Sequence, residues 1–273
     1  MSAWYRLDGE LREVRPRERA FQYGDGLFET IAVRGGELRL WDYHADRLER
    51  GATRLGYRVP GRPALQALVE NAIARSGENP VRCIAKLVLA ATGDERGYRR
   101  TIPTACQVYV GVFASTPVAA EAYEQGVDTQ LCETRLAPGS PVAGLKTLNR
   151  LEQVLARSEG RLGGLFEGLM LDAEGRLICG TMSNVFMVRG NEIETPALWR
   201  CGVAGVMRRV VLERLETSER PVRERDIDAI ALGDADEVFL TNSQFGVLPV
   251  RRCGRHRWPV GSVTRALMER LPE

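Results

Sequence analysis

Lysine is almost absent from this sequence. Of the 38 basic residues only Lys86 and Lys146 are lysines, and arginine supplies the rest. A compositional preference for arginine explains the general shortage. An amine, unlike a guanidinium, can lose its proton and attack a carbonyl carbon. Each of the two lysines is therefore a candidate for chemistry that arginine cannot perform.

Histidine and paired cysteine are also scarce. His44 and His256 lie far apart in the chain, and no C-x-x-C pair occurs. This pattern argues against a zinc site and against a disulfide framework. A cysteine nucleophile with a distant histidine stays open, although inert thiols in a reducing compartment are the simpler interpretation. The six cysteines are Cys83, Cys106, Cys132, Cys179, Cys201 and Cys253.

Long apolar runs and blocks of like charge are missing as well. The formal net charge is +2, from 38 basic and 36 acidic residues, and no cluster of either sign could serve as a nucleic-acid or membrane patch. No stretch approaches the roughly 18 apolar residues of a membrane span. The first residues are already charged, without the apolar region of a signal peptide. We therefore expect a soluble cytoplasmic protein.

The order of strand and helix patterns predicts an α+β fold. Hairpins and meanders alternate with helical periodicity, which favours α+β over a doubly wound parallel sheet. Proline and small residues around 115–126 predict an interdomain linker. We expect an N-terminal domain over 1–115, a linker over 116–122 and a C-terminal domain over 123–273.

Local patterns predict the individual elements. Asp42 is the expected N-cap of a helix over 43–56. The apolar runs at 81–93 and 105–115 predict adjacent antiparallel strands. The other expectations are an opening hairpin at 5–14, helices over 62–76, 147–161, 204–216, 225–231 and 262–271, and strands over 21–40, 127–136, 167–196, 236–243 and 247–253.

Lys146 ends the segment PVAGLK, directly before the helix signal TLNRLEQV. This order predicts a side chain at a loop-to-helix junction, a position that can open onto a cavity. A partly desolvated lysine there would have a lowered pKa and could form a Schiff base with an aldehyde cofactor. A solvated lysine beside a helix is the alternative. Lys86, inside an apolar run, is either an edge-strand charge or a site residue.

Three segments carry groups that bind anions. Glycines before a helix leave free backbone N–H groups at Val206 and Met207, at the positive end of the helix dipole. Arg47 offers a guanidinium fork for a phosphate. Each feature alone is ordinary turn chemistry, whereas their joint presence with a mid-chain lysine is more informative. The third segment ends a strand with Thr241, Asn242 and Ser243.

Several runs resemble one enzyme family, in the family's order and over nearly the whole chain. They are RAFQYGDGLFET at 19–30, DYHADRL at 42–48, GLKTLNRLEQVL at 144–155, SNVF at 183–186 and GVAGVMRR at 202–209. Together they resemble the fold-type IV pyridoxal-phosphate enzymes of the class IV aminotransferase family. This family includes branched-chain and D-amino-acid aminotransferases and the aminodeoxychorismate lyases. The lysine segment, the R-G-Y at 96–98 and the A-G-V-M-R helix start are most similar to the lyases.

The resemblance implies a fold, a cofactor and an assembly. It implies an α+β N-terminal domain, a C-terminal domain with a barrel-like sheet, pyridoxal 5'-phosphate between them, and a homodimer. Lys146 would be the Schiff-base lysine and Arg47 a phosphate ligand, and Lys86 would take a structural or substrate-adjacent role. The remaining phosphate ligands would be Val206, Met207, Asn242 and Ser243.

The implied reaction is removal of pyruvate from 4-amino-4-deoxychorismate to give 4-aminobenzoate, in functional coupling to aminodeoxychorismate synthase. Lys146 would remove the proton at the carbon that bears nitrogen, and Thr30 would relay a proton to the departing oxygen. Arg96 would hold substrate carboxylates and Tyr98 would close over the ring. Further substrate-binding candidates are Phe28, Tyr23 and Asn149. An aminotransferase and a cofactor-free binding protein on this fold are the alternatives.

One position departs from the family pattern. Aminotransferases of this family place a glutamate against the pyridine nitrogen, whereas this sequence has Cys179 in CGTMSNVF. A thiol cannot hold the ring nitrogen protonated as a carboxylate does, so we expect a weaker electron sink and hence the lyase reaction. Alternatively, Glu174, Asp172 or Glu133 takes over the contact.

Overall fold

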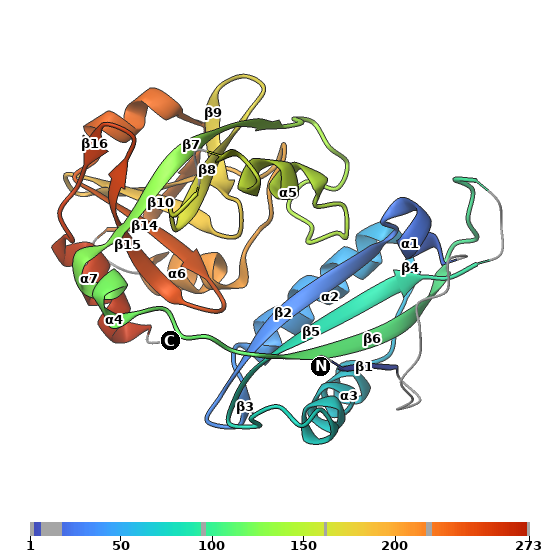
Figure 1. Cartoon of the computed structure of the whole chain (residues 1–273). Coiled ribbons are helices and arrows are strands. Elements are labelled where there is room, and N and C mark those ends of the chain that lie inside the picture. Colours follow the sequence, from blue (N-terminus) through green and yellow to red (C-terminus); the bar gives the residue numbers. More distant parts are fainter. Residues whose placement is uncertain (1–2, 7–17, 94–96, 161–162, 217–219, 272–273) are drawn as a thin grey trace. The chain divides into compact units, whose positions relative to one another are not determined.

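The chain forms two compact units in a computed structural model (Figure 1). Unit 1 includes a short segment, Leu145–Asn149, from far along the chain. The full bounds are Met1–Thr116 and Leu145–Asn149 for unit 1, and Pro117–Gly144 and Arg150–Glu273 for unit 2. The structure describes residues 3–6, 18–93, 97–160, 163–216 and 220–271.

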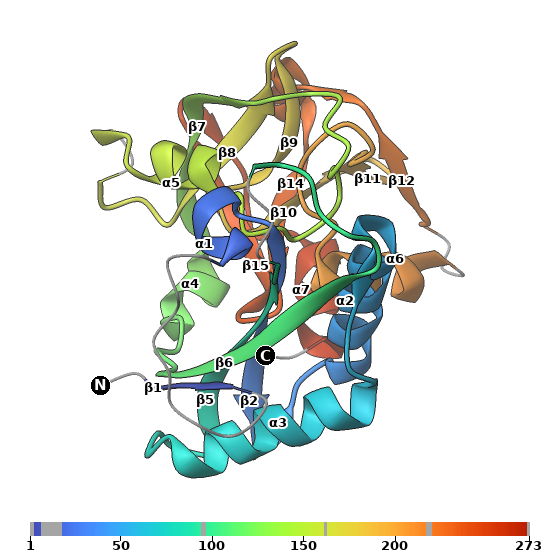
Figure 2. The ribbon, with the colours of Figure 1, turned by 90° about the vertical axis from the view of Figure 1, so that its right-hand side faces the viewer.

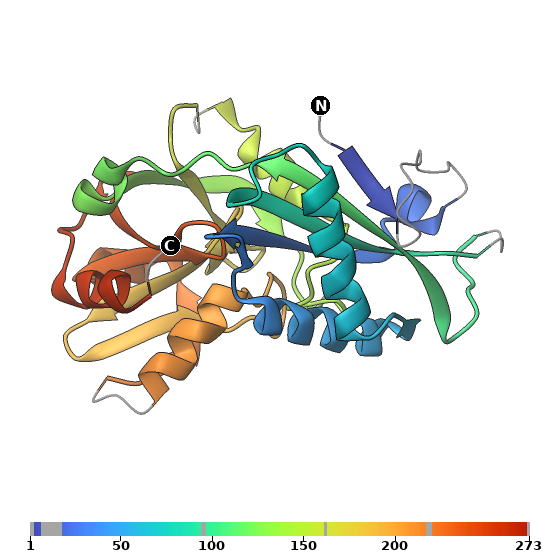
Figure 3. The same cartoon turned by 90° about the horizontal axis from the view of Figure 1, so that it is seen from below.

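Unit 1 is built on a six-stranded sheet of order β1-β6-β5-β2-β3, with β4 paired to β6. Its pairs are antiparallel except for β4 with β6. Helices α2 and α3 pack against the sheet (Figures 2 and 3). The strands are β1 (Ala3–Arg6), β2 (Gly26–Arg34), β3 (Glu37–Leu38), β4 (Tyr57–Arg58), β5 (Arg82–Ala91) and β6 (Thr104–Ala114), and the helices are α1 (Arg19–Tyr23), α2 (Trp41–Leu55) and α3 (Arg62–Arg75).

Strands β5 and β6 lie side by side and antiparallel, which confirms the prediction from the two apolar runs. Every residue of β5 from Leu87 to Ala91 is buried, as expected for apolar side chains on a covered sheet. On the other side β5 pairs with β2, and this register places Lys86 directly opposite Thr30. The sheet therefore brings one of the two lysines to the predicted hydroxyl.

Helix α2 begins earlier than predicted. Its N-cap is Leu40, in the left-handed conformation at φ 55°, and Asp42 lies in the first turn. The expectation that Asp42 caps the helix is therefore wrong. At this position its carboxylate is still favourable, because it lies near the positive end of the helix dipole. The predicted helix over 62–76 corresponds to α3.

Unit 2 contains a ten-stranded sheet of order β12-β11-β10-β14-β15-β7-β8-β9-β13, with β16 paired to β15. Parallel pairs occur at β7 with β8, β7 with β15, and β11 with β12. The strands are β7 (Val127–Leu136), β8 (Glu167–Asp172), β9 (Arg176–Gly180), β10 (Asn184–Arg189), β11 (Glu192–Pro196), β12 (Val222–Arg225), β13 (Ile227–Asp228), β14 (Glu237–Asn242), β15 (Gly246–Cys253) and β16 (His256–Arg257).

The sheet of unit 2 curves into a barrel-like form. Strand β9 lies against β10 and β11, which belong to the other half of the strand order. Across the register of β10 and β14, Phe186 and Phe239 stack with ring centroids 4.9 Å apart. Both side chains are fully buried, so apolar packing fills this part of the sheet. The α+β fold with a barrel-like C-terminal sheet is thus confirmed. Its helices are α4 (Ala120–Gln125), α5 (Leu151–Arg157), α6 (Val206–Glu216), α7 (Ser262–Arg270) and the 3-10 helix η2 (Ala229–Asp234).

Three local expectations differ from the structure. Helix α5 starts at Leu151, four residues later than predicted from 147–161. Helix α4 occupies part of the expected linker. The segment 225–231, predicted to be a helix, contains β13 and the start of η2. The opening hairpin lies mostly outside the described residues. Among those described, no helix has the length and apolar character that a membrane span requires.

Candidate functional site

Lys146 lies in an extended segment, and the predicted loop-to-helix junction is wrong. The carbonyl of Lys146 accepts a hydrogen bond from the Phe28 N–H at 3.0 Å, and the Leu148 N–H donates to Gly26 O at 3.0 Å. Thr147 forms an antiparallel bridge with Leu27. The segment thus runs along β2 as an additional short strand. Backbone hydrogen bonds to a sheet hold Lys146 more firmly than a loop would.

The two lysines of the chain meet at one aromatic ring. Lys146 Nζ lies 4.4 Å from the centroid of the Phe28 ring, and Lys86 Nζ lies 4.9 Å from it. Phe28 and Thr30 alternate on the same face of β2, and Lys86 is opposite Thr30. Burial lowers the pKa of Lys86. This face of unit 1 therefore combines two amines, an aromatic ring and a hydroxyl.

The opposite face of β2 carries a buried carboxylate, Glu29, which contacts α2. Its oxygens accept hydrogen bonds from Arg47 Nε, at 2.8 Å, and from Arg47 Nη2. His44 Nδ1 lies 2.6 Å from the same carboxylate. Burial alone would raise the pKa of Glu29, but the charge and hydrogen bonds of Arg47, with those of His44, lower it to about 2. Glu29 is therefore ionised at neutral pH.

His44 is the neutral member of this group. Burial lowers its pKa, against the opposing effect of the Glu29 hydrogen bond, and the positive charges of Arg47 and Lys146 lower it further. A neutral imidazole beside an ionised carboxylate donates from Nδ1, which leaves Nε2 as an acceptor. His44 Nε2 is buried without a hydrogen-bond partner among the described residues.

The start of α6 presents backbone N–H groups in unit 2. The first helical hydrogen bond of α6 runs from Arg209 N–H to Gly205 O, so the N–H groups of Val206 and Met207 have no acceptor within the helix. Asn184 holds the preceding loop, because its Oδ1 accepts from the Gly205 N–H at 3.1 Å and its Nδ2 donates to Val203 O at 3.0 Å. A Cβ at Gly205 would lie 2.1 Å from Asn184 Oδ1, so only glycine fits there.

The end of β14 lies against the same asparagine. Thr241 is opposite Asn184 in the register of β10 and β14, and its buried hydroxyl has no hydrogen-bond partner among the described residues. Asn242 Oδ1 accepts from the N–H groups of Gln244 and Phe245, which shapes the turn that contains Ser243. A helix start, a glycine-only approach and an orphaned hydroxyl fit a phosphate group.

Cys179 is buried on β9, and its thiol is neutral. Burial raises the pKa of Cys179 well above its ordinary value, and the negative charge of Glu167 adds to the effect. The three carboxylates expected as substitutes have other surroundings: Asp172 and Glu174 pair with Arg176, and Glu133 is exposed. The carboxylate that acts on Cys179 is therefore Glu167, which the sequence patterns did not suggest.

Glu167 organises the segment between β9 and β10. It is fully buried and accepts hydrogen bonds from the backbone N–H groups of Gly168, Thr181 and Met182. The hydroxyls of Thr181 and Ser183 also donate to it, at 2.5 and 2.8 Å. One carboxylate thus fixes the turn that leads into Asn184. The sequence signal was its position, since an acidic residue that opens a strand buried at every position needs partners.

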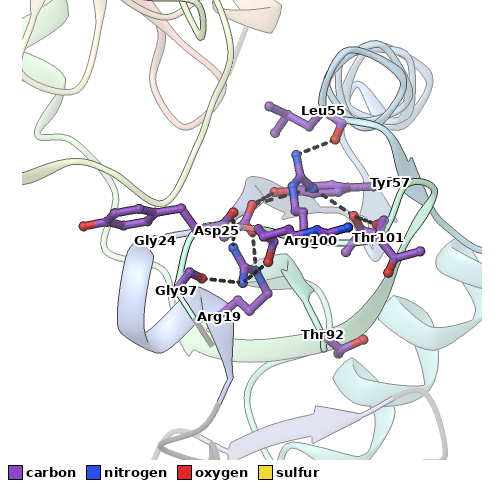
Figure 4. A network of polar contacts seen from close by, with 12 residues as sticks. Arg19, Gly24, Asp25, Leu55, Tyr57, Thr92, Gly97, Arg100 and Thr101 are labelled. Atoms are coloured by element: carbon purple, nitrogen blue, oxygen red, sulfur yellow. Dashed lines mark hydrogen bonds and ion pairs between the residues drawn. The ribbon is translucent and has the colours of Figure 1, made fainter. Parts of the chain in front are cut away.

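Arg19 and Asp25 hold the segment that carries Tyr98 (Figure 4). Arg19 donates to Asp25 at 2.9 Å and to the carbonyls of Gly97, Tyr98 and Arg99 at 3.0 to 3.2 Å. Asp25 also accepts from the Tyr57 hydroxyl at 2.6 Å. Residues 97–99 are therefore anchored by backbone contacts.

The other predicted substrate residues of unit 1 have mixed surroundings. The ring of Tyr98 is 87 % exposed and lies 5.5 Å from that of Tyr23. Asn149 donates to Gly24 O at 3.1 Å, a contact that fixes the turn before β2. Arg96 lies outside the described residues.

A groove of about 610 Å³ lies in unit 2. Gly144, Trp199, Ala204 and Arg208 line part of it. Val206 is absent from the lining, so this groove is separate from the N–H groups at the start of α6. No group of three or more histidine, cysteine or acidic side chains among the described residues is arranged to hold a metal ion.

The predicted residues fall into two sets. In unit 1 the structure gathers Lys146, Thr30 and Phe28, to which it adds Lys86. In unit 2 it gathers the start of α6 and the end of β14 around Asn184. Residues that the sequence patterns missed are Glu29, His44, Glu167, Thr241 and Arg19.

Comparisons with known proteins support one family. The sequence matches the family described as amino-transferase class IV over residues 26–253. It is 34% identical to the aminodeoxychorismate lyase of Vibrio harveyi, over 93% of this chain and 94% of that protein. The crystal structure of 4-amino-4-deoxychorismate lyase from Pseudomonas aeruginosa superposes with a TM-score of 0.89 at 41% identity, covering 98% of this chain and 97% of that one.

More distant relatives share the fold. The Escherichia coli branched-chain amino acid aminotransferase superposes with a TM-score of 0.84 at 23% identity, over 98% of this chain and 92% of that one. The motifs around Lys146 and at the start of α6 lie inside the matched region. The chain belongs to the class IV aminotransferase family, as its motifs predict.

Proposed function

We propose that this chain is a pyridoxal-phosphate-dependent lyase that converts 4-amino-4-deoxychorismate to 4-aminobenzoate and pyruvate. The observation that carries the proposal is the placement of the Lys146 amine at the Phe28 ring, on the face of β2 that carries Thr30 and Lys86. Its likeness to the lyases of Pseudomonas aeruginosa and Vibrio harveyi supports the same reaction. We further propose that it acts as a cytoplasmic homodimer.

The cofactor would be held through its aldehyde and its phosphate. Lys146 would bind the aldehyde, and Arg47, Val206, Met207 and Ser243, with Asn242 shaping the turn, would bind the phosphate. Gly144, two residues before Lys146, donates to Gly202 O and accepts from the Ala204 N–H, each at 3.0 Å, in the loop that leads to α6. When bound, the cofactor supplies a carbonyl for the substrate amine and a ring that delocalises electrons.

The residues of the chain would move two protons. The neutral Lys146 amine takes the proton from the ring carbon that bears nitrogen, while the bond between the neighbouring carbon and the enolpyruvyl oxygen breaks. Thr30 relays a proton from Lys146 to that oxygen, and the released enol becomes pyruvate. Aromatisation of the ring drives the elimination. Each turnover therefore returns Lys146 to its starting protonation state.

Lys86 would bind a substrate carboxylate, with Arg96 and Tyr98 as further substrate contacts. Replacing Lys86 by methionine keeps the length of the side chain and removes its charge. We expect KM to rise about 10- to 100-fold, because a hydrogen bond to a charged group contributes about 1.5–3 kcal/mol. Steady-state kinetics with Lys86→Arg as the charge-preserving control measures this. An unchanged KM in Lys86→Met would exclude the contact.

Cys179 would limit the chain to elimination. Cys179→Glu supplies a carboxylate like that of the aminotransferases. We expect conversion of the bound cofactor to pyridoxamine phosphate by a branched-chain or D-amino acid to become at least about tenfold faster, which corresponds to about 1.4 kcal/mol. Stopped-flow absorbance measures the conversion, and Cys179→Ser is the matched control. Equal rates in the wild type and in Cys179→Glu would contradict this role.

The proposed function is tested by a coupled assay. The purified protein is mixed with chorismate, glutamine and active aminodeoxychorismate synthase, and the fluorescence of 4-aminobenzoate is followed. We expect product only when all components are present. Absence of product, together with formation of pyridoxamine phosphate from amino acids, would assign the chain to the aminotransferases. Light scattering at known concentration tests the homodimer.

A further inference from the structure

The contact between Glu29 and Arg47 uses a single edge of the guanidinium. Nε and Nη2 of Arg47 face the two carboxylate oxygens of Glu29, which leaves Nη1 and one Nη2 hydrogen outside the pair. Such a two-point contact fixes both the position and the plane of the guanidinium. Arg47 is 7% exposed and Glu29 is 1% exposed, so solvent does little to loosen the pair.

His44 braces the carboxylate from a second direction. Its Nδ1–H donates to Glu29 Oε2, the oxygen that also accepts from Arg47 Nη2. His44 and Arg47 are three residues apart on α2, so both project from neighbouring turns towards β2. The buried Nε2 of His44, without a partner among the described residues, points to a ligand or water beside this group.

Stability alone does not explain a buried ion pair of this kind. Desolvation of both charges offsets most of their attraction, and apolar residues of similar volume are often equally stable. Orientation is the property that an apolar replacement would lose. An arginine whose rotamer is already fixed loses less entropy when an anion binds to its remaining edge.

We propose that Glu29 and His44 are positioning residues that orient the Arg47 guanidinium towards the phosphate of pyridoxal phosphate. The inference rests on the proposed function, because it takes Arg47 as a phosphate ligand. Glu29 lies on the face of β2 opposite Phe28 and Thr30, so it acts through Arg47 and not on the reacting atoms.

The test measures phosphate preference, defined as the Kd of pyridoxal divided by the Kd of pyridoxal phosphate. Both ligands react with a lysine, but only one presents a phosphate to Arg47. Glu29→Gln replaces one acceptor oxygen by an NH₂ group that opposes the donors of Arg47 and His44. We expect the preference to fall about tenfold, with a change in the ³¹P chemical shift of the bound cofactor. Absorbance titration measures both constants.

Two further variants separate positioning from folding. In an Arg47→Lys background, Glu29→Gln is expected to have little additional effect on the preference, because the residue acts through Arg47. Glu29→Asp keeps the charge and is expected to show an intermediate preference. The matched control is Glu194→Gln, another carboxylate 1% exposed that pairs with two arginines, Arg189 and Arg225. It is expected to leave the preference unchanged.

The outcomes distinguish this inference from the proposed function. A wild-type protein that binds no pyridoxal phosphate, or shows no phosphate preference, contradicts the proposed function. A wild type with the preference, together with an unchanged or higher preference in Glu29→Gln, overturns the positioning role alone. Additive effects of the Glu29 and Arg47 substitutions overturn it as well.

Discussion

Replacing Lys146 by alanine is expected to abolish formation of 4-aminobenzoate. Under the proposed mechanism this amine both carries the cofactor and moves the substrate proton, so both functions disappear together. Positioned proton transfer alone contributes about 10²–10⁴ in rate, and the loss should exceed about 10³-fold. The yellow absorbance of the purified protein should disappear as well. Product fluorescence and the absorption spectrum measure the two effects.

The scarcity of lysine makes the attachment site decisive to map. Borohydride reduction followed by peptide mass analysis should place the cofactor on the peptide that contains Lys146. Lys86→Met is the matched control, because it removes the other lysine of the chain and should keep both colour and label. A label on Lys86, or a colourless wild-type protein, would refute the assignment.

Replacing Glu167 by alanine is expected to have the largest effect on stability. It removes the acceptor for three backbone N–H groups and two hydroxyls in a fully buried position. Breaking a buried charged network of this kind costs about 3–5 kcal/mol. For a protein of this size each kcal/mol lowers Tm by about 2–4 °C, so a decrease of roughly 6–20 °C should follow. Calorimetry measures it.

The same change should weaken cofactor binding, because Glu167 fixes the turn that leads into Asn184, and Asn184 holds the loop before α6. Glu174→Ala is the control, since the Glu174 side chain is 55% exposed and its loss should change stability by less than about 0.5 kcal/mol. A Tm for Glu167→Ala within a degree of the wild type would show that the network contributes little.

Short motifs and local periodicity were sufficient to predict the family, the α+β class and most of the elements. The apolar runs that became β5 and β6 carry alternation and β-branched residues, and these depend on neighbours in the sequence. The error at Lys146 had a local cause: the pattern TLNRLEQV has helical composition throughout, yet α5 begins only at Leu151. Hydrogen bonds from β2 keep the first residues of that pattern extended.

The amino-acid sequence by itself determined which residues are rare and therefore informative, above all the two lysines. Only the tertiary structure decided what surrounds them. Phe28 meets lysines 58 and 118 positions away along the chain, and Glu167 meets the turn at 181–183, because strand register brings distant segments together. Register depends on the summed burial of whole strands. No local window of sequence contains that sum, and so the contacts of Glu29, Lys86 and Glu167 became visible only in the folded chain.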